Sequence, residues 1–379
     1  MKKIISILVL AAVSAAAFAR KEASDSPKTG ILDLNPAQKV LPVLLTARTS
    51  GGTWDKPATE EAVTFLHFSD LHGCTANLER IVEFYGAYSE YIADAIHTGD
   101  VVAGYWDNPN PWNQVKGAEK ILNVVGNHDC WKGHKVWAES EIPYDASAED
   151  AYKTIMAPFI KGWNVTQPTG VGDRNSENWC ACYYYKDYPK SKVRLVVLDC
   201  MHDRDGGVQV RWFENVLQDA ADKGFTVICA EHYFAQTGLV SVDSGFSTNP
   251  YVYGCYEPDK PQIECLRDVF FTCIDKFIDN GGAFVCWLSG HDHEDYIGLV
   301  CGHERQLQIL VGKAGDKDIY IHEDRTPGTS NQDLFNLVTV NPSKHLLVIQ
   351  RIGCNVGPQM RSKNIFSFDY LSRNIVVKE

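Results

Sequence analysis

The chain has 379 residues, 45% of them hydrophobic and 22% charged, which is the composition of a globular protein with a large core. Its formal net charge is −12. This charge argues against a nucleic-acid duplex as the main ligand, because proteins that bind one need a basic surface. It leaves small anionic substrates open, since a local metal cluster can hold them against the overall charge.

Residues 1–19 have the pattern of a secretion signal. Two lysines near the start precede an apolar stretch at 4–18, which ends in the small-residue cleavage pattern Ala17-Phe18-Ala19. The stretch is shorter than the roughly 20 residues of a membrane-spanning helix. We therefore expect cleavage after Ala19, no transmembrane segment, and a secreted or periplasmic protein.

The rest of the chain predicts a leader followed by one domain. Residues 20–61 are at first rich in Ser, Lys and Asp, and they include an expected extra strand at 40–46. Nothing between residues 62 and 379 marks a second domain. Within this single domain we expect insertions near 103–116, 131–178 and 239–261.

The 12 cysteines leave the disulfide pattern open. Export would permit disulfides, and Cys255 and Cys265 flank a Pro-rich loop that a bridge could close. Cysteines inside apolar runs are instead expected to be small buried residues. These are Cys200, Cys229, Cys273 and Cys286.

Apolar periodicity predicts helices and strands that alternate along the domain, followed by a strand-rich tail. The expected helices are 77–96, 210–222 and 263–280. The expected strands are 65–68, 118–125, 180–185, 192–199, 225–230, 283–288, 306–311, 318–322, 334–340, 345–351 and 375–378. This order predicts an α/β (α+β) fold, a four-layer αββα sandwich of two mixed β-sheets flanked by helices.

Metal-ligating side chains recur where apolar runs end. Asp70 and His72 follow the first strand, and residues two apart in an extended chain point to the same face. Oxygen and nitrogen ligands together favour Mn, Fe or Zn over Ca, although one such pair is also ordinary turn chemistry. Four further clusters follow other apolar runs: Asp100, Asn127 with His128, His232, and His291 with His293. Because open sheets bind ligands beyond the carboxyl ends of their strands, we expect all five to converge on one crevice.

The order of these five clusters resembles the calcineurin-like metallophosphoesterase superfamily, whose pattern is D-x-H, G-D, G-N-H-(D/E), a lone His and G-H-x-H. The resemblance spans roughly residues 62–300 and implies the same four-layer sandwich. The matching segments are Asp70-Leu71-His72, Gly99-Asp100, Gly126-Asn127-His128-Asp129, His232 and Gly290-His291-Asp292-His293.

The resemblance implies two divalent metal ions, with Mn, Fe and Zn as the candidates. Asp70, His72 and His293 would hold one ion. Asn127, His232 and His291 would hold the other, with Asp100 bridging the two. These are the residues implied as metal ligands: Asp70, His72, Asp100, Asn127, His232, His291 and His293.

The implied reaction is hydrolysis of phosphate esters, either phosphodiesters or phosphomonoesters, of a small-molecule substrate. A hydroxide that bridges the metals would attack phosphorus in line, and the metals would meet the charge that builds on the phosphoryl oxygens. The resemblance makes His128 the group that protonates or hydrogen-bonds the leaving oxygen. Asp129 is expected to orient the His128 imidazole.

Differences from the sequence patterns of two known subfamilies argue against membership of either. Protein Ser/Thr phosphatases have Asp-Arg-Gly shortly after the second motif, whereas Asp100 here is followed by residues 101–105, which lack that arginine. Purple acid phosphatases place a tyrosine three residues after the bridging Asp, where this chain has Ala103, and lack the histidine of the first motif, His72 here. The remaining resemblance is to secreted bacterial phosphohydrolases grouped with phosphodiesterases.

The sequence leaves alternatives open for the residues that contact the substrate and for the activity itself. Tyr105, Trp106 and Trp131 lie in expected loops after metal motifs, where their rings could stack on a nucleobase or sugar or pack an insertion against the core. One alternative function is a non-catalytic protein that binds phosphorylated ligands or glycans on a retained fold. Another is a mononuclear zinc hydrolase that cleaves a different bond.

Overall fold

The structure is a computed structural model, and it describes residues 62–103, 110–130, 148–200, 207–235, 239–241, 266–316, 325–326, 329, 332–354 and 365–378. Several predictions fall outside these residues: the secretion signal at 1–19, the leader at 20–61, the strand at 318–322, Tyr105, Trp106, Trp131, Cys255 and Cys265. Within the described part of the chain, no helix has the length and apolar character needed to cross a membrane.

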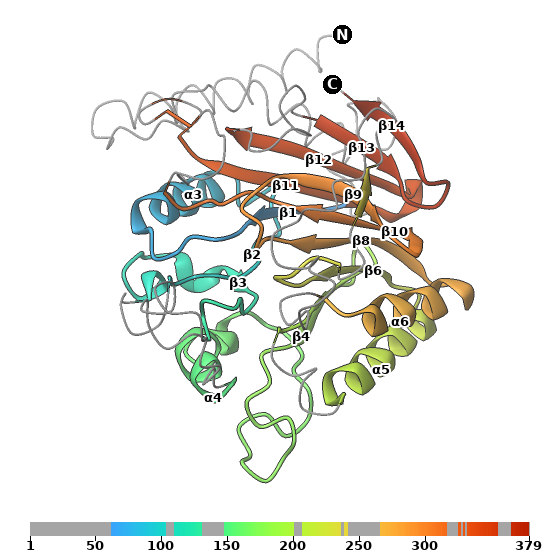
Figure 1. The fold of residues 1–379 in the computed structure, drawn as a ribbon, viewed down its shortest axis with the longest axis horizontal. Coiled ribbons are helices and arrows are strands. Elements are labelled where there is room, and N and C mark those ends of the chain that lie inside the picture. Colours follow the sequence, from blue (N-terminus) through green and yellow to red (C-terminus); the bar gives the residue numbers. More distant parts are fainter. Residues whose placement is uncertain are drawn as a thin grey trace, which may run out of the picture.

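Two mixed sheets form the centre of the fold (Figure 1). In the first, β1, β2 and β3 are parallel and the other neighbours are antiparallel. Its strand order is β14(Asn374–Lys378), β13(Ile365–Asp369), β12(Leu346–Gly353), β11(Leu334–Asn341), β1(Val63–Phe68), β2(Asp94–His97) and β3(Leu122–Asn123). The parallel strands therefore end at one edge, which is where Asp70 and Asp100 follow.

The second sheet has a parallel centre made of β5, β6, β8 and β10. Strands β4, β9 and β7 are antiparallel to their neighbours. The order is β4(Tyr184–Tyr188), β5(Val193–Val197), β6(Thr226–Ala230), β8(Ala283–Ser289), β10(His303–Leu310), β9(Tyr296–Val300) and β7(Leu239–Ser241). The central strands carry His232 and His291 just beyond their carboxyl ends.

Continuous apolar runs form the central strands because both of their faces are covered. All six residues of β1 are buried, as are all five of β5 and of β6. In Figure 1 the sheet with β11 and β12 lies above the sheet with β6 and β8. The core therefore lies largely between and around two sheets that share no strand.

Helices cover the sheets. Helix α3(Thr75–Ala87) buries Leu78, Ile81 and Phe84, and the Phe84 ring lies 4.8 Å from that of Phe335 in β11. Helices α5(Val208–Lys223) and α6(Asp268–Asp279) pack against each other and against β6, β8 and β10. The short helices are η2(Pro111–Asn113), η3(Ala118–Lys120), α4(Ala148–Ala151), η5(Tyr152–Met156), η6(Ile160–Gly162) and η8(Pro342–Lys344).

The predicted α/β fold of two mixed sheets with flanking helices is confirmed, although several boundaries differ. The helix expected at 77–96 ends at Ala87, and the buried strand β2 occupies the end of that range. The strand expected at 118–125 is a single turn of 3₁₀ helix followed by the two-residue strand β3. Strands β7, β9 and β13 were not expected. The hairpin of β4 and β5 agrees with the prediction.

Buried polar pairs join the two sheets. Arg351 of β12 is ion-paired with Asp295, which precedes β9, and their exposed fractions are 3% and 1%. The Asp295 carboxylate also accepts the N–H of Gly312, 2.9 Å away. At another point, the Lys186 ammonium of β4 lies 2.8 Å from the Asp94 carboxylate of β2. These contacts fix one sheet against the other close to the strand ends.

We predict that Arg351→Met lowers the free energy of unfolding by about 3 kcal/mol, because it leaves the Asp295 carboxylate buried without its partner. Urea denaturation followed by tryptophan fluorescence measures the change. Arg305→Met is the control, since Arg305 pairs with Asp279 at the surface and such pairs contribute less than about 1 kcal/mol. Adding Asp295→Asn should restore part of the loss. Equal small losses in the two single variants would contradict a stabilising role for the buried pair.

Candidate metal centre

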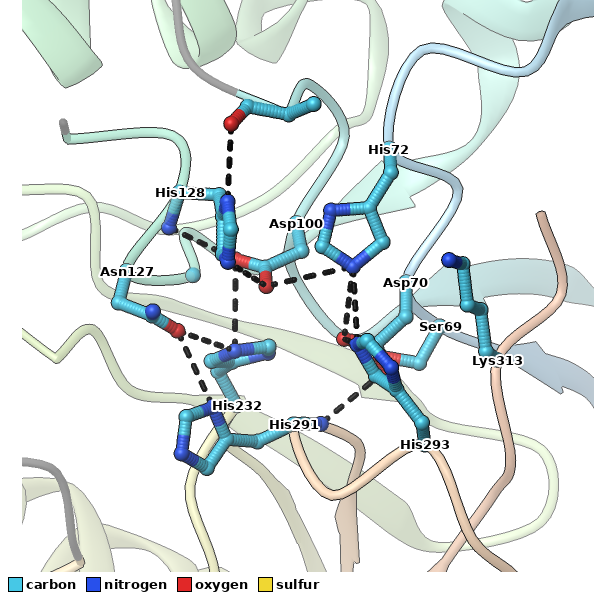
Figure 2. A network of polar contacts seen from close by, with 12 residues as sticks. Ser69, Asp70, His72, Asp100, Asn127, His128, His232, His291, His293 and Lys313 are labelled. Carbon is cyan, nitrogen blue, oxygen red and sulfur yellow. Dashed lines mark hydrogen bonds and ion pairs between the residues drawn. The ribbon is translucent and has the colours of Figure 1, made fainter. Parts of the chain in front are cut away.

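The loops after five strands bring the predicted site residues together (Figure 2). From the first sheet, β1 is followed by Asp70 and His72, β2 by Asp100, and β3 by Asn127, His128 and Asp129. From the second, β6 is followed by His232, and β8 by His291 and His293. The prediction that all five clusters converge is confirmed by the contacts described below.

The backbone at these loops is strained. Five of the predicted ligands have φ between 46° and 73°, in the left-handed region: Asp70, His72, Asp100, His291 and His293. Residues other than glycine rarely adopt this conformation, and each instance costs about 1–3 kcal/mol. The expectation that Asp70 and His72 share a face because the chain is extended is therefore wrong. A left-handed turn brings the two side chains together instead.

Three side chains form the first half of the site. The Nε2 atoms of His72 and His293 lie 2.9 Å apart, and the Asp70 Oδ1 atom lies 3.8 Å from the former and 3.6 Å from the latter. Asp70 is fully buried, yet its Oδ1 has no hydrogen-bond partner among the residues that the structure describes. A buried carboxylate oxygen without a partner is costly, and a cation held between these three atoms would remove that cost.

Three other side chains form the second half. The Asn127 Oδ1 atom lies 2.9 Å from His232 Nε2 and 3.1 Å from His291 Nδ1. The His232 Nδ1–H donates to the carbonyl oxygen of Thr98 at 2.7 Å, so in the neutral ring the Nε2 atom has only a lone pair. That lone pair faces oxygen atoms that also lack a proton. A metal ion satisfies such a group of electron-pair donors.

Asp100 lies between the two halves. Its Oδ1 atom is 3.4 Å from His232 Nε2, and its Oδ2 atom is 3.8 Å from His72 Nε2. Each oxygen therefore faces a different half of the cluster, which is the arrangement of a bridging carboxylate. The groups of side chains whose ligating atoms lie close enough to share an ion include both Asp70–His72–His293 and Asp100–His232–His291.

Two glycine residues make the close packing of the ligating side chains possible. A Cβ atom on Gly126 would lie 2.3 Å from Asp100 Oδ1, and one on Gly290 would lie 1.8 Å from the Ser69 hydroxyl and 2.6 Å from Asp70 Oδ2. Either side chain would displace a carboxylate of the cluster. The glycines of the third and fifth motifs are therefore needed for close packing against the ligands.

The charges inside the cluster keep the Asp100 carboxyl ionised, as a metal ligand must be. Burial opposes the ionisation of Asp100, but the histidines His232 and His128 outweigh it and hold the pKa of the carboxyl well below its usual value. Burial also opposes a charge on His232, yet Asp100 raises the pKa of this ring to about 10. Burial lowers the pKa of His72 and His291 well below the usual value, which leaves these two rings neutral and able to bind a metal.

His128 and Asp129 have different neighbours from those expected. The His128 Nδ1 atom donates to the carbonyl oxygen of Ala103 at 2.9 Å, and its Nε2 atom lies 3.8 Å from Asp100 Oδ2. The Asp129 carboxylate instead accepts the N–H groups of Gly126, Asp100 and Val102. The prediction that Asp129 orients the His128 imidazole is therefore wrong. The Ala103 carbonyl does so, and Asp129 holds two loops together.

Sequence reasoning missed several residues around the cluster. The Thr98 carbonyl oxygen accepts hydrogen bonds from both the His232 Nδ1–H and the Ser69 hydroxyl. Every residue has a backbone carbonyl, so the sequence does not indicate which one acts as an acceptor. Lys313 lies beside the cluster (Figure 2). It could have been found, because it follows β10, which ends at the same edge as β8.

A known protein family matches the part of the chain that contains this site. The model of the family described as Calcineurin-like phosphoesterase matches residues 63–295, which is more than half of the chain and includes every predicted site residue. Curated protein sequences give no match.

Solved structures give only weak likenesses. A dimetal phosphatase from Danio rerio is 14% identical, with 77% of this chain and 96% of that chain covered, at a TM-score of 0.47. The anchor protein GAP50 of the Plasmodium inner membrane complex is 10% identical, with 84% and 88% covered, at 0.34. A metallophosphoesterase from Sphaerobacter thermophilus is 12% identical, with 78% and 89% covered, at 0.27. These likenesses carry no argument about function.

The geometry predicts two cations per chain and a requirement for Asp100. After loading with Mn²⁺ and gel filtration, the unmodified protein should contain close to two ions by mass spectrometry. Asp100→Asn should contain fewer than one, because it removes the carboxylate charge that faces both halves. Asp222→Asn, which alters an exposed carboxylate of α5, should match the unmodified protein. One ion in the unmodified protein would favour the mononuclear alternative.

Proposed function

Because the chain belongs to the calcineurin-like phosphoesterase family, we propose that it hydrolyses phosphate esters at a site for two divalent cations. The main support is the position of Asp100, whose two oxygens face separate groups of ligating side chains. A non-catalytic descendant of the fold would be expected to have lost some of these side chains. The chain has kept all of them.

The residues present fit the two cations. Asp70, whose Oδ1 atom has no hydrogen-bond partner in the described part of the chain, would hold one cation together with His72 and His293. Asn127, His232 and His291 would hold the other. When bound, two such cations lower the pKa of a water molecule and offset the negative charge of a phosphoryl group.

Backbone carbonyls set the protonation of the two histidines that face Asp100. The Nδ1–H groups of His232 and His128 are both used by carbonyl oxygens, those of Thr98 and Ala103. The reactive atom of each ring is therefore Nε2. His232 is fully buried, whereas the His128 side chain keeps an exposed fraction of 12%.

The position of His128 supports a proton-handling role for this residue. Its Nε2 atom lies 3.8 Å from Asp100 Oδ2 and its ring is partly exposed, so it can hold a proton for the leaving oxygen of the ester. Asp129 contributes indirectly: its carboxylate binds the N–H groups of both Gly126 and Asp100. It thereby fixes the loops that carry Asp100 and His128 relative to each other.

We further propose that the protein is exported and acts outside the cytoplasm. The support is the sequence pattern of residues 1–19, with two lysines followed by an apolar stretch and small residues before position 20. In this proposal the substrate is a small phosphoester of the exterior or periplasm, and the chain resembles secreted bacterial phosphohydrolases.

We predict that His128→Asn keeps both metal ions but slows turnover. For an ester with a poor leaving group, such as phenyl phosphate, the loss in kcat should be about 100-fold, as is typical of lost general acid catalysis. For p-nitrophenyl phosphate the loss in kcat should be smaller, because p-nitrophenolate is a better leaving group and depends less on protonation.

His345→Asn is the matched control, because His345 is exposed and has φ of 55°, which asparagine tolerates. An unchanged rate in His128→Asn would remove His128 from the mechanism. If the metal-loaded, unmodified protein binds phosphate but hydrolyses no monoester, diester or nucleotide, the non-catalytic alternative would replace the proposed function.

A further inference from the structure

The loop after β10 brings a lysine to the metal centre. Strand β10 is parallel to β8, so the loop that follows it lies at the same sheet edge as the loop with His291 and His293. Figure 2 shows the Lys313 side chain beside Asp70 and His293, with its ammonium group extending toward the part of the cluster that contains His72. The side chain is half-buried, so it is neither sealed in the core nor fully free in water.

Hydrogen bonds fix the backbone around Lys313 to one loop from each sheet. Its N–H donates to the carbonyl oxygen of His293 at 3.2 Å, and the N–H of Ala314 donates to the carbonyl oxygen of Ser69 at 2.9 Å. On its other side, the Arg325 guanidinium donates to the Lys313 carbonyl oxygen at 2.6 Å. The position of the lysine is thus tied to the loops that carry Asp70 and His293.

The Lys313 charge acts on the cluster, whereas two neighbouring arginines serve the protein interior. Burial is the main cause of the low pKa of His72, and the positive charge of Lys313 contributes to it. Arg351 is buried against Asp295, and Arg325 is buried and donates to backbone carbonyls. Of these three cations, Lys313 is the one placed to meet a ligand that approaches the metal ions.

We propose that Lys313 binds an ionised phosphoryl oxygen of the substrate and thereby favours phosphomonoesters over phosphodiesters. This inference rests on the proposed function. A phosphomonoester loses its second proton with a pKa of about 6, so it carries close to two charges at neutral pH, whereas a diester carries one. An ammonium group is a point charge that binds phosphate oxygens. Its attraction to the substrate is therefore stronger for the doubly charged monoester than for the singly charged diester.

The first experiment compares two substrates in four Mn²⁺-loaded proteins: the unmodified chain, Lys313→Met, Lys313→Arg and Lys344→Met. Lys344 is exposed in the turn between β11 and β12, near the amino-terminal end of β1 and thus at the opposite end of the sheet from Asp70. It serves as the matched control for loss of a lysine.

Lys313→Met should lose roughly tenfold or more in kcat/KM on p-nitrophenyl phosphate and much less on bis(p-nitrophenyl) phosphate. Metal content should stay the same. Lys313→Arg should keep most of the activity on the monoester, because it keeps the charge, and Lys344→Met should match the unmodified chain. Equal losses on both esters would overturn the proposal.

The second experiment does not depend on turnover. Isothermal titration calorimetry with inorganic phosphate should show binding to the Mn²⁺-loaded protein that is about tenfold weaker in Lys313→Met and nearly unchanged in Lys313→Arg. Unchanged phosphate affinity in Lys313→Met would overturn the proposal, as would a loss of bound metal in that variant, which would make the lysine a structural residue.

The two experiments separate this inference from the proposed function. If the unmodified protein hydrolyses no ester but still loses phosphate affinity on Lys313→Met, the hydrolase proposal fails and the lysine remains an anion-binding residue. If it hydrolyses both esters and Lys313→Met leaves their ratio unchanged, the hydrolase proposal stands and the role of Lys313 is refuted.

Discussion

The Asp100 carboxylate is the group on which the rest of the site depends. It is 1% exposed, and its Oδ1 atom accepts the backbone N–H of His128 at 2.9 Å while also facing His232. Its own N–H donates to Asp129, and its carbonyl oxygen accepts the N–H of His72 at 3.0 Å. One buried residue in a left-handed conformation therefore contacts the loops after β1, β3 and β6. Displacing it would separate the two halves of the cluster.

This arrangement requires both sheets, and neither sheet could form it alone. The first supplies the carboxylates and Asn127, and the second supplies His232, His291 and His293. Because the ligating side chains come from both sheets, the protein must hold the sheets together near the strand ends. The buried Arg351–Asp295 pair does this beside the His291–His293 loop, and the Asp94–Lys186 contact does it at the other end of the parallel strands. The polar links between the sheets therefore support the site as well as the fold.

The sequence predicted the site better than its surroundings, and the reason is physical. Ligand side chains follow apolar strands whose ends are fixed by the sheet, so the positions of Asp70, Asp100 and His232 could be expected from local pattern and order. The left-handed backbone of Asp70 was not predictable, because only the completed contacts compensate for its strain. The Asp129 carboxylate was assigned the wrong partner because its actual partners are backbone N–H groups, which every residue offers. Strand β9 was missed because it follows the ligand motif almost without a turn.

His232 and His128 differ in their surroundings at the cluster. His232 and His128 each donate an Nδ1–H to a carbonyl oxygen, so both present Nε2 to the cluster. The Nε2 atom of His232 faces two oxygens within 3.4 Å in a fully buried position, where a metal ion would replace the proton that Asp100 otherwise holds on this ring. The Nε2 atom of His128 is farther from Asp100, and its ring is partly exposed, so it can exchange a proton with a ligand. Backbone carbonyls therefore set both tautomers, and the fold, rather than the identity of the neighbouring side chains, directs both Nε2 atoms toward the cluster.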